Sequence, residues 1–228
     1  MKIFAISDLH IATTTDKPMD IFGSKWVGYL DKIKQDWLEK VSEEDIVLIS
    51  GDLSWAMKLQ DAMVDLEFLS NLKGKKVIIR GNHDYWWSGI GKIRKVLPNG
   101  VFALQNDSVK FGKYIICGSR GWTLEDNSEQ DKKLVAREVE RFRLTLKDAV
   151  KQKEDGDVII CMIHYPPFNN AREDSPFTKL FEEYGVNYVV YGHLHGKDCK
   201  AELKHDKNGI TYYLTSCDLL NNQLIKII

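Results

Sequence analysis

The sequence predicts an α/β layered domain, built either around one mixed sheet or around two stacked sheets with helices on the outside. Two patterns lead to this prediction. In the first half of the chain, short apolar runs of strand length alternate with amphipathic segments of helix length, whereas the second half has more strand-like runs in succession. The 228 residues suit one domain with a substantial core, and no repeat or linker-like tract divides them. We therefore expect a single domain over residues 1–228.

Strands are predicted at short runs that are rich in Val, Ile and Tyr and are bounded by polar or glycine-containing segments. In chain order these runs are Lys2–Ser7, Ile46–Ser50, Lys76–Arg80, Val101–Gln105, Tyr114–Gly118, Val158–Ile163, Tyr188–Tyr191, Thr211–Thr215 and Gln223–Ile228. We expect them to form the buried strands of the sheets.

Helices are predicted at about Trp26–Val41, Leu59–Leu72, Ile90–Val96, Ser128–Lys153 and Pro176–Tyr184. The fourth is long and charged, and its apolar residues recur near helical spacing: Leu134, Val135, Val139, Phe142, Leu146 and Val150. This pattern is typical of a surface helix that packs one face against a core. Residues 12–28 form a longish loop before the first helix, which either shapes a substrate pocket or simply connects.

Composition limits the class of protein. Hydrophobic residues make up 43% of the chain and charged residues 29%, an ordinary balance for a globular protein. Lys and Arg number 32 against 33 Asp and Glu, so the net charge gives no support for broad nucleic-acid binding. The four cysteines are widely spaced, which favours small core residues in a reducing compartment. With no leader pattern and no apolar run of roughly 20 residues, we expect a cytoplasmic protein with no membrane partner.

Polar residues follow the predicted strands at the point where each strand ends. Five of the six histidines occur there: His10, His83, His164, His193 and His195. Asp8, Asp52 and Asn82 occupy the same kind of position. Imidazole, carboxylate and amide oxygens together suit Mn, Fe, Zn, Co or Ni. A single such residue is more often structural, but a metal-free core would have to satisfy every one of these by hydrogen bonding. The pattern therefore favours a metal centre.

These residues form a series that resembles the calcineurin-like metallophosphoesterase superfamily. The series is Asp8-x-His10, Gly51-Asp52, Gly81-Asn82-His83-Asp84, His164 and Gly192-His193-x-His195. All five blocks are present in the family's order, from residue 8 to residue 195. The resemblance implies a sandwich of two stacked mixed β-sheets flanked by helices. It is specific for a phosphoesterase with a dinuclear metal centre and only weakly specific for the substrate.

The resemblance also implies a role for each residue. Two divalent or trivalent transition-metal ions, Mn, Fe or Zn, would be bound by Asp8, His10 and His195 at one position and by Asn82, His164 and His193 at the other, with Asp52 as a bridge. His83 would protonate the leaving oxygen or stabilise the developing charge, and Asp84 would orient its imidazole. A hydroxide held between the metals would then attack the phosphate in line, without a covalent phosphoenzyme.

Two arginines at strand ends are candidates for substrate binding. Arg80 directly precedes the Gly-Asn-His-Asp block, and Arg120 follows another predicted strand. Either guanidinium could bind phosphate through two hydrogen bonds, or could be an ordinary surface or ion-paired arginine. Four tryptophans lie within a few residues of a site motif: Trp55, Trp86, Trp87 and Trp122. They could form an aromatic wall around a flat leaving group, or could pack at the rim of the sheets.

One departure from the family pattern narrows the substrate class. The protein phosphatase branch has an arginine four positions after the bridging Asp and a Glu after the Asn-His pair, where this chain has Ala56 and Asp84. The chain therefore resembles the phosphodiesterase, nuclease and small-molecule hydrolase branches. We expect a phosphorylated small molecule or nucleotide as substrate, either a monoester or a diester. The alternatives are a metal-dependent nuclease and a non-catalytic scaffold of the same fold. No oligomeric state is predicted.

Overall fold

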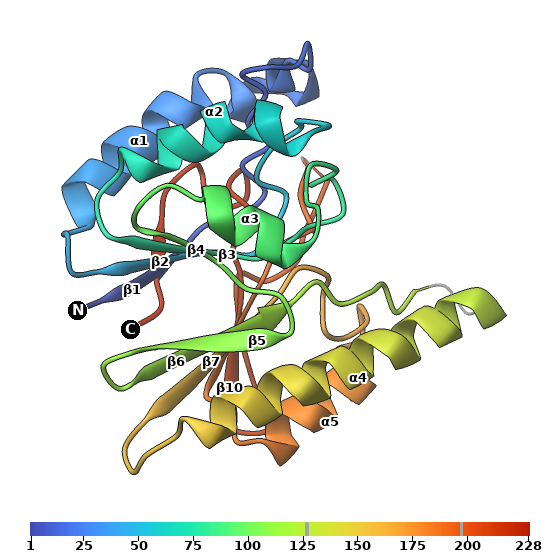
Figure 1. Cartoon of the computed structure of the whole chain (residues 1–228). Coiled ribbons are helices and arrows are strands. Elements are labelled where there is room, and N and C mark those ends of the chain that lie inside the picture. The colour runs from blue at the N-terminus through green and yellow to red at the C-terminus, as the bar shows by residue number, and fades with distance from the viewer. Residues whose placement is uncertain (126–127, 197) are drawn as a thin grey trace.

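Two β-sheets lie face to face in the computed structural model, which describes residues 1–125, 128–196 and 198–228. Helices α1 (Tyr29–Lys40), α2 (Leu59–Ser70) and α3 (Ile90–Val96) cover the outer face of the first sheet. Helices α4 (Glu129–Lys151) and α5 (Pro176–Glu183) cover the outer face of the second sheet (Figure 1). The layers therefore run helix, sheet, sheet, helix, and the expected α/β sandwich is confirmed.

The first sheet has the strand order β11-β1-β2-β3-β4. Its strands are β11 (Ile225–Lys226), β1 (Ile3–Ala5), β2 (Ile46–Ile49), β3 (Lys75–Ile78) and β4 (Val101–Ala103). The last four are parallel, and β11 is antiparallel to β1, so the two ends of the chain lie side by side. Because parallel neighbours require crossover connections, the helices follow the strands in alternation.

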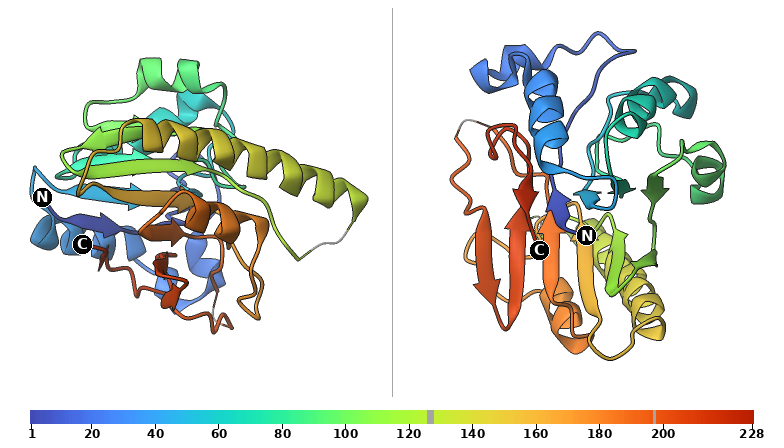
Figure 2. Two further views of the ribbon diagram at one scale, coloured as in Figure 1. Left: turned by 90° about the horizontal axis from the view of Figure 1, so that it is seen from below. Right: turned by 90° about the vertical axis from the view of Figure 1, so that its left-hand side faces the viewer.

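The second sheet has the order β5-β6-β7-β8-β10-β9. Its strands are β5 (Asp107–Phe111), β6 (Tyr114–Ser119), β7 (Val158–Ile163), β8 (Tyr188–Tyr191), β10 (Ile210–Leu214) and β9 (Lys204–Lys207). The four inner strands are parallel, and the two edge strands are antiparallel to their neighbours. Figure 2 shows the two sheets and the twist of their strands from two further sides.

The core has three layers, because successive side chains of each strand point to opposite faces. In β2, Ile46 and Leu48 pack between the two sheets, whereas Val47 and Ile49 pack against the helices. The expected surface helix is confirmed in α4, which buries Phe142, among others, against the second sheet. Within the described residues, no helix is both long and apolar enough to cross a membrane.

The structure differs from the predicted elements mainly at the sheet edges. β5 and β9 were not predicted, because their sequences DSVKF and KHDK lack the apolar pattern of a buried strand. Edge strands require only one partner for their backbone, and charged side chains there prevent pairing with other chains. The predicted strand Gln223–Ile228 reduces to Ile225–Lys226, and the helix predicted from Trp26 begins only at Tyr29, after a 3-10 turn at residues 24–26.

Candidate metal centre

The candidate ligands lie at the carboxyl ends of parallel strands in both sheets. Asp8 and His10 follow β1, Asp52 follows β2, Asn82 follows β3, His164 follows β7, and His193 and His195 follow β8. Hydrogen bonds join these loops across the two sheets: the His193 N–H donates to both carboxylate oxygens of Asp8, at 3.0 and 3.1 Å. Since parallel strands end at one edge, segments far apart in sequence meet in a single site.

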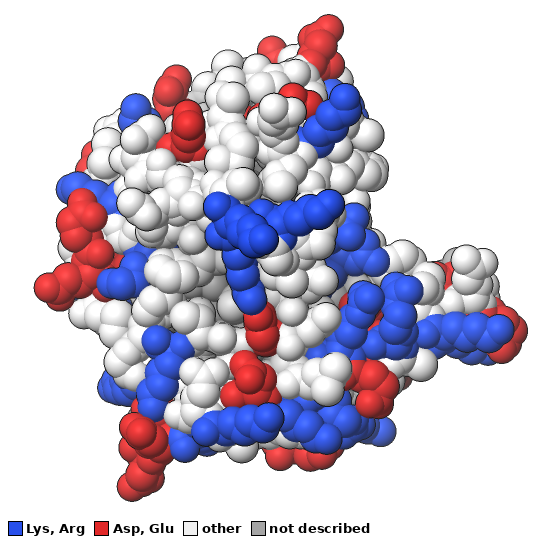
Figure 3. Space-filling model, in the orientation of Figure 1, with Lys and Arg blue, Asp and Glu red and all other residues white. Residues whose placement is uncertain are grey.

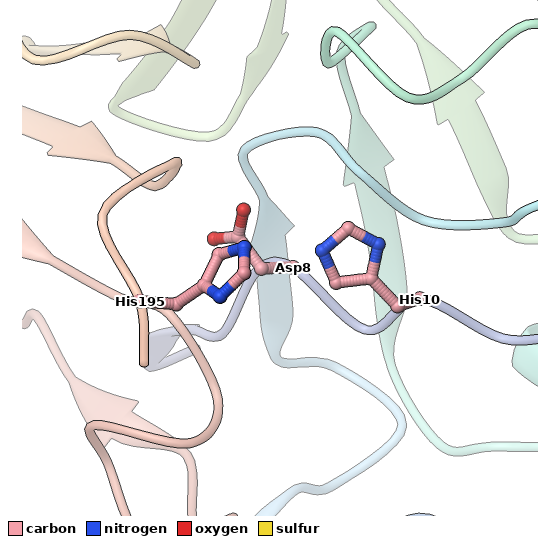
Figure 4. Close-up of side chains that lie close together, drawn as sticks. All are labelled: Asp8, His10 and His195. Atoms are coloured by element: carbon pink, nitrogen blue, oxygen red, sulfur yellow. The ribbon is translucent and has the colours of Figure 1, made fainter. Parts of the chain in front are cut away.

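Two groups of potential ligands share the carboxylate of Asp8. The first group is Asp8, His10 and His195, and the second is Asp8, Asp52 and His164. Within each group, one ligand atom per residue lies within 4.8 Å of the others. Figure 4 shows the Asp8 carboxylate beside the imidazole of His195, with His10 next to Asp8 on the segment that follows β1.

Asp52 belongs to the second group and also lies near His10 of the first. Its Oδ2 is 3.8 Å from Nε2 of His10 and 3.5 Å from Nε2 of His164. Its Oδ1 accepts a hydrogen bond from the His83 backbone N–H at 2.7 Å, which holds the carboxylate in place. This is the position that a carboxylate shared by two cations would occupy.

Two imidazole rings converge at the Asn82 amide oxygen. Nε2 of His164 lies 2.6 Å from Oδ1 of Asn82, and Nδ1 of His193 lies 2.9 Å from the same atom. The other nitrogen of His164 faces the carbonyl oxygen of Ser50 at 2.8 Å, and a carbonyl can only accept, so Nδ1 is the protonated nitrogen. In the neutral ring Nε2 therefore carries a lone pair that faces another acceptor. A cation bound by both atoms would satisfy both lone pairs.

His10 gives the plainest test of whether this site fits metal ions. The residue is 1% exposed, and both of its ring nitrogens lack a hydrogen-bond partner among the described residues. Its ring stacks on Trp55 with the centroids 4.9 Å apart. A buried polar atom without a partner costs free energy, and a metal ion bound at one ring nitrogen would offset part of that cost, so His10 fits the role of a metal ligand.

The backbone is strained at four of the candidate ligands. Asp8, His10, Asp52 and His193 have φ angles of 55°, 46°, 51° and 70°, in the left-handed region. That conformation costs an L-residue roughly 1–2 kcal/mol. Such strain is retained where the surrounding structure forces it, and it occurs often at functional sites.

Electrostatics also favour a bound cation. Burial raises the pKa of Asp8 to about 6, and burial together with the neighbouring Asp84 raises that of Asp52 to about 8. Burial lowers the pKa of His193 to about 3 and that of His10 well below its usual value. The site therefore disfavours both isolated carboxylates and imidazolium rings. A bound transition-metal ion would relieve both effects, because it binds the neutral form of imidazole and its positive charge compensates the negative charge of the carboxylates.

Asp84 does not have the contact that was expected for it. Its buried carboxylate accepts hydrogen bonds from Trp86 and from the backbone N–H groups of Asp52, Leu53, Ser54 and Gly81. The Nδ1 atom of His83 has no hydrogen-bond partner among the described residues. All the acceptor capacity of Asp84 is used by the loops after β2 and β3, so it positions Asp52 and Asn82 rather than the His83 ring.

A cavity of about 790 Å³ opens beside the first ligand group. His10, His83 and His195 line it, together with Trp26, Trp55, Met19 and Phe22. The loop of residues 12–28 thus shapes a pocket, and Trp55 belongs to an aromatic wall. Met19 and Phe22 were not predicted there, because apolar residues in a loop have no distinctive pattern.

The other three tryptophans have different surroundings. Trp86 and Trp87 are 2% and 4% exposed, and their indole N–H groups donate to Asp84 and Gln105, so they pack as ordinary core residues. The guanidinium carbon of Arg120 lies over the ring of Trp122, 4.9 Å from the centroid of that ring. Arg120 and Arg80 together line a separate, smaller cavity.

Metal removal is expected to destabilise the protein. Binding at 100–1,000 times Kd contributes about 2.7–4.1 kcal/mol, and for a chain of this length each kcal/mol shifts Tm by roughly 2–4 °C. Calorimetric scans of metal-free protein should therefore show Tm rising by about 5–15 °C with Mn, Fe or Zn. The variant Glu140→Gln, at an exposed carboxylate, should keep this shift. An unchanged Tm at millimolar concentrations of all three metals would contradict the prediction.

The Gly81→Ala substitution is expected to displace Asp52. A Cβ at position 81 would lie 2.1 Å from Oδ1 and 2.2 Å from the backbone N of Asp52. The overlap involves backbone, so we expect a loss of about 1–3 kcal/mol of stability together with a lower metal content. Gly91→Ala is the matched control, because a Cβ there has no heavy atom within 4 Å. Denaturant unfolding and elemental analysis would measure both effects; equal behaviour of the two variants would contradict the close approach.

Comparisons with known proteins agree with this geometry. The fold is similar to that of TT1561 from Thermus thermophilus, with a TM-score of 0.62 and 12% identity over 98% of this chain and 96% of that chain. It is also similar to AQ665 from Aquifex aeolicus, a protein of unknown function, with a TM-score of 0.51 and 14% identity over 99% and 95% of the two chains. No match was found among curated proteins. Residues 1–197 match the calcineurin-like phosphoesterase family, and the chain belongs to that family.

Proposed function

We propose that this protein is a phosphohydrolase with two metal ions that cleaves a phosphate ester of a small molecule or nucleotide. The observation that supports it most strongly is the convergence of two ligand groups that share Asp8, the second of which contains Asp52, whose carboxylate also lies near His10 of the first. The proposed ligands are Asp8, His10 and His195 for one metal and Asn82, His164 and His193 for the other, with Asp52 as the bridge. When bound, such a metal pair neutralises phosphate charge and makes water nucleophilic near neutral pH.

His83 is the proposed proton donor to the leaving group. Its ring lies 4.5 Å from that of Trp55 and 5.6 Å from that of His10, measured between centroids, and it lines the large cavity. Burial and the neighbouring imidazoles lower the pKa of His83 below its ordinary value. An anionic phosphate beside the ring would raise that pKa again, so the imidazole would gain its proton when the substrate binds.

The size and lining of the large cavity favour a small substrate. A volume of about 790 Å³ lies within the range of roughly 300–1,000 Å³ that is typical of small-molecule sites. Trp26, Trp55 and Phe22 offer aromatic surface to a nucleobase or another flat leaving group. A polymeric nucleic acid would gain little from such a pocket.

The test is hydrolysis after reconstitution of metal-free protein with Mn, Fe or Zn. We expect turnover of p-nitrophenyl phosphate or its bis-ester with at least one metal, and loss of that turnover on chelation. Faster cleavage of single-stranded DNA or RNA would favour the nuclease alternative. Metal-loaded protein that is inert toward all of these esters would overturn the proposal in favour of a scaffold.

A further inference from the structure

A second cavity, beside the metal centre, is lined by four arginines. It has a volume of about 280 Å³, and its arginines are Arg80, Arg120, Arg137 and Arg141. Arg80 and Arg120 come from the loops after β3 and β6, at the same sheet edge as the candidate ligands. Arg137 and Arg141 are one turn apart on α4, so both can face the cavity. Figure 3 shows basic side chains gathered over α4 on one face of the molecule. We call this cavity the arginine pocket.

The arginine pocket is connected to the metal centre through the backbone. The carbonyl oxygen of Arg120 accepts hydrogen bonds from the backbone N–H groups of His164 and Tyr165, at 3.0 and 3.3 Å. Arg80 directly precedes Gly81, against which Asp52 packs. A group bound in the arginine pocket would therefore lie next to the proposed metal site.

The positive charge of the arginine pocket is only partly neutralised. Arg137 and Arg141 both pair with Oε1 of the buried Glu138, at 3.2 and 2.6 Å. Among the described residues, no carboxylate lies within 4.0 Å of the guanidinium of Arg80 or Arg120, and the buried Nε of Arg80 has no hydrogen-bond partner. Four guanidinium groups thus face one carboxylate, an excess of three positive charges.

Another arginine of the same helix has carboxylate partners of its own outside the arginine pocket. Arg143 pairs with Glu140 at 3.4 Å and lies 3.6 Å from Glu183, and it does not line the arginine pocket. Partly buried cations of like sign repel one another unless an anion lies between them. A phosphate group suits this place, because planar guanidinium groups bind its oxygens in pairs.

We propose that the arginine pocket binds a second phosphate group of the substrate, which is not the one cleaved. The substrate class is then a small molecule with two phosphate groups, such as a nucleoside diphosphate or a bisphosphate. This inference rests on the proposed function, since the phosphate to be cleaved lies at the metal centre. The experiments below separate binding in the arginine pocket from catalysis.

The first experiment measures binding of inorganic phosphate to metal-free protein by calorimetry. We expect binding to weaken about tenfold in Arg80→Gln and in Arg137→Gln, and to stay unchanged in the control Arg143→Gln. Arg137→Gln leaves Glu138 paired with Arg141, so the helix keeps its buried ion pair. Circular dichroism would verify the fold of each variant. Equal phosphate affinity in all four proteins would overturn the proposal.

The second experiment compares kcat/KM for matched substrates with one and with two phosphates, a nucleoside monophosphate against the diphosphate and a sugar monophosphate against the bisphosphate. For at least one pair, we expect wild type and Arg143→Gln to prefer the compound with two phosphates about tenfold, and Arg137→Gln to lose this preference. If the protein binds phosphate but does not prefer substrates with two phosphates, the arginine pocket binds a free anion and the proposal is overturned. Normal phosphate binding with no hydrolysis of any ester would overturn the proposed function and, with it, the assignment to a substrate.

Discussion

Replacement of Asp52 by Asn is expected to lower kcat/KM toward aryl phosphates by at least about a thousandfold. The amide can still accept the His83 backbone N–H, so the loop geometry should survive. What is lost is the negative charge between His10 and His164. A metal pair contributes several kcal/mol to stabilising the transition state, and each 1.36 kcal/mol is a factor of ten in rate. We also expect elemental analysis to show fewer metal ions per chain.

The metal-free Asp52→Asn protein should be at least as stable as wild type. Burial raises the pKa of this carboxyl to about 8, so the folded state disfavours its ionised form and a neutral amide removes that cost. Asp36→Asn is the matched control, because Asp36 is a buried acid on α1 that pairs with Lys40 and lies outside both ligand groups. The control should keep its metals and its activity. Full activity and metal content in Asp52→Asn would refute the bridging role.

The candidate metal centre could be predicted from sequence because its residues come in short blocks at strand ends. In a parallel sheet, a residue such as Asp8 or Asn82 at the end of an apolar run must lie at the same edge as the others. The apolar strands themselves are strong signals, since each contributes side chains to two layers of the core. For these residues, the position at the end of an apolar run in the sequence therefore also gives the position in the fold.

Other parts of the site depend on contacts that have no local pattern. Arg137 and Arg141 belong to a charged helix in which most charged residues are solvated, and only the packing of α4 beside β6 brings them near Arg120. Four of the five hydrogen-bond donors to Asp84 are backbone N–H groups, which every residue has except proline. The edge strand β9 pairs with β10 through its backbone, which any sequence can do, so its polar sequence carries no strand signal.

Asp84 stabilises the loops of the site rather than the His83 ring. One buried carboxylate ties together the two loops that carry Asp52 and Asn82, and thereby places both relative to the strands. The His83 ring is then oriented by packing, against Trp55 and beside His10 and Tyr85, rather than by a carboxylate. A ring that is free of such a partner can respond more readily to the charge of a bound phosphate.

Replacement of His83 by Gln is expected to separate proton donation from metal binding. With an alkyl phosphate, whose alkoxide is a poor leaving group, we expect kcat to fall by about 10²–10⁴, the usual contribution of a general acid. With p-nitrophenyl phosphate the leaving group needs no proton, so the loss should be far smaller. The side chain of His83 belongs to neither ligand group, and the metal content should stay that of wild type.

The control for this substitution is His205→Gln, since His205 lies on β9 beside Phe168 and Arg172, away from the ligands. It should leave the rates with both esters unchanged. Equal losses in His83→Gln with the two leaving groups would show that His83 stabilises charge on the phosphate rather than donating a proton, because charge stabilisation does not depend on the basicity of the departing oxygen. If the loss of rate in His83→Gln depends on the leaving group while the metal content is unchanged, proton transfer explains the dependence. The same metals, cavity and phosphate are present in both assays.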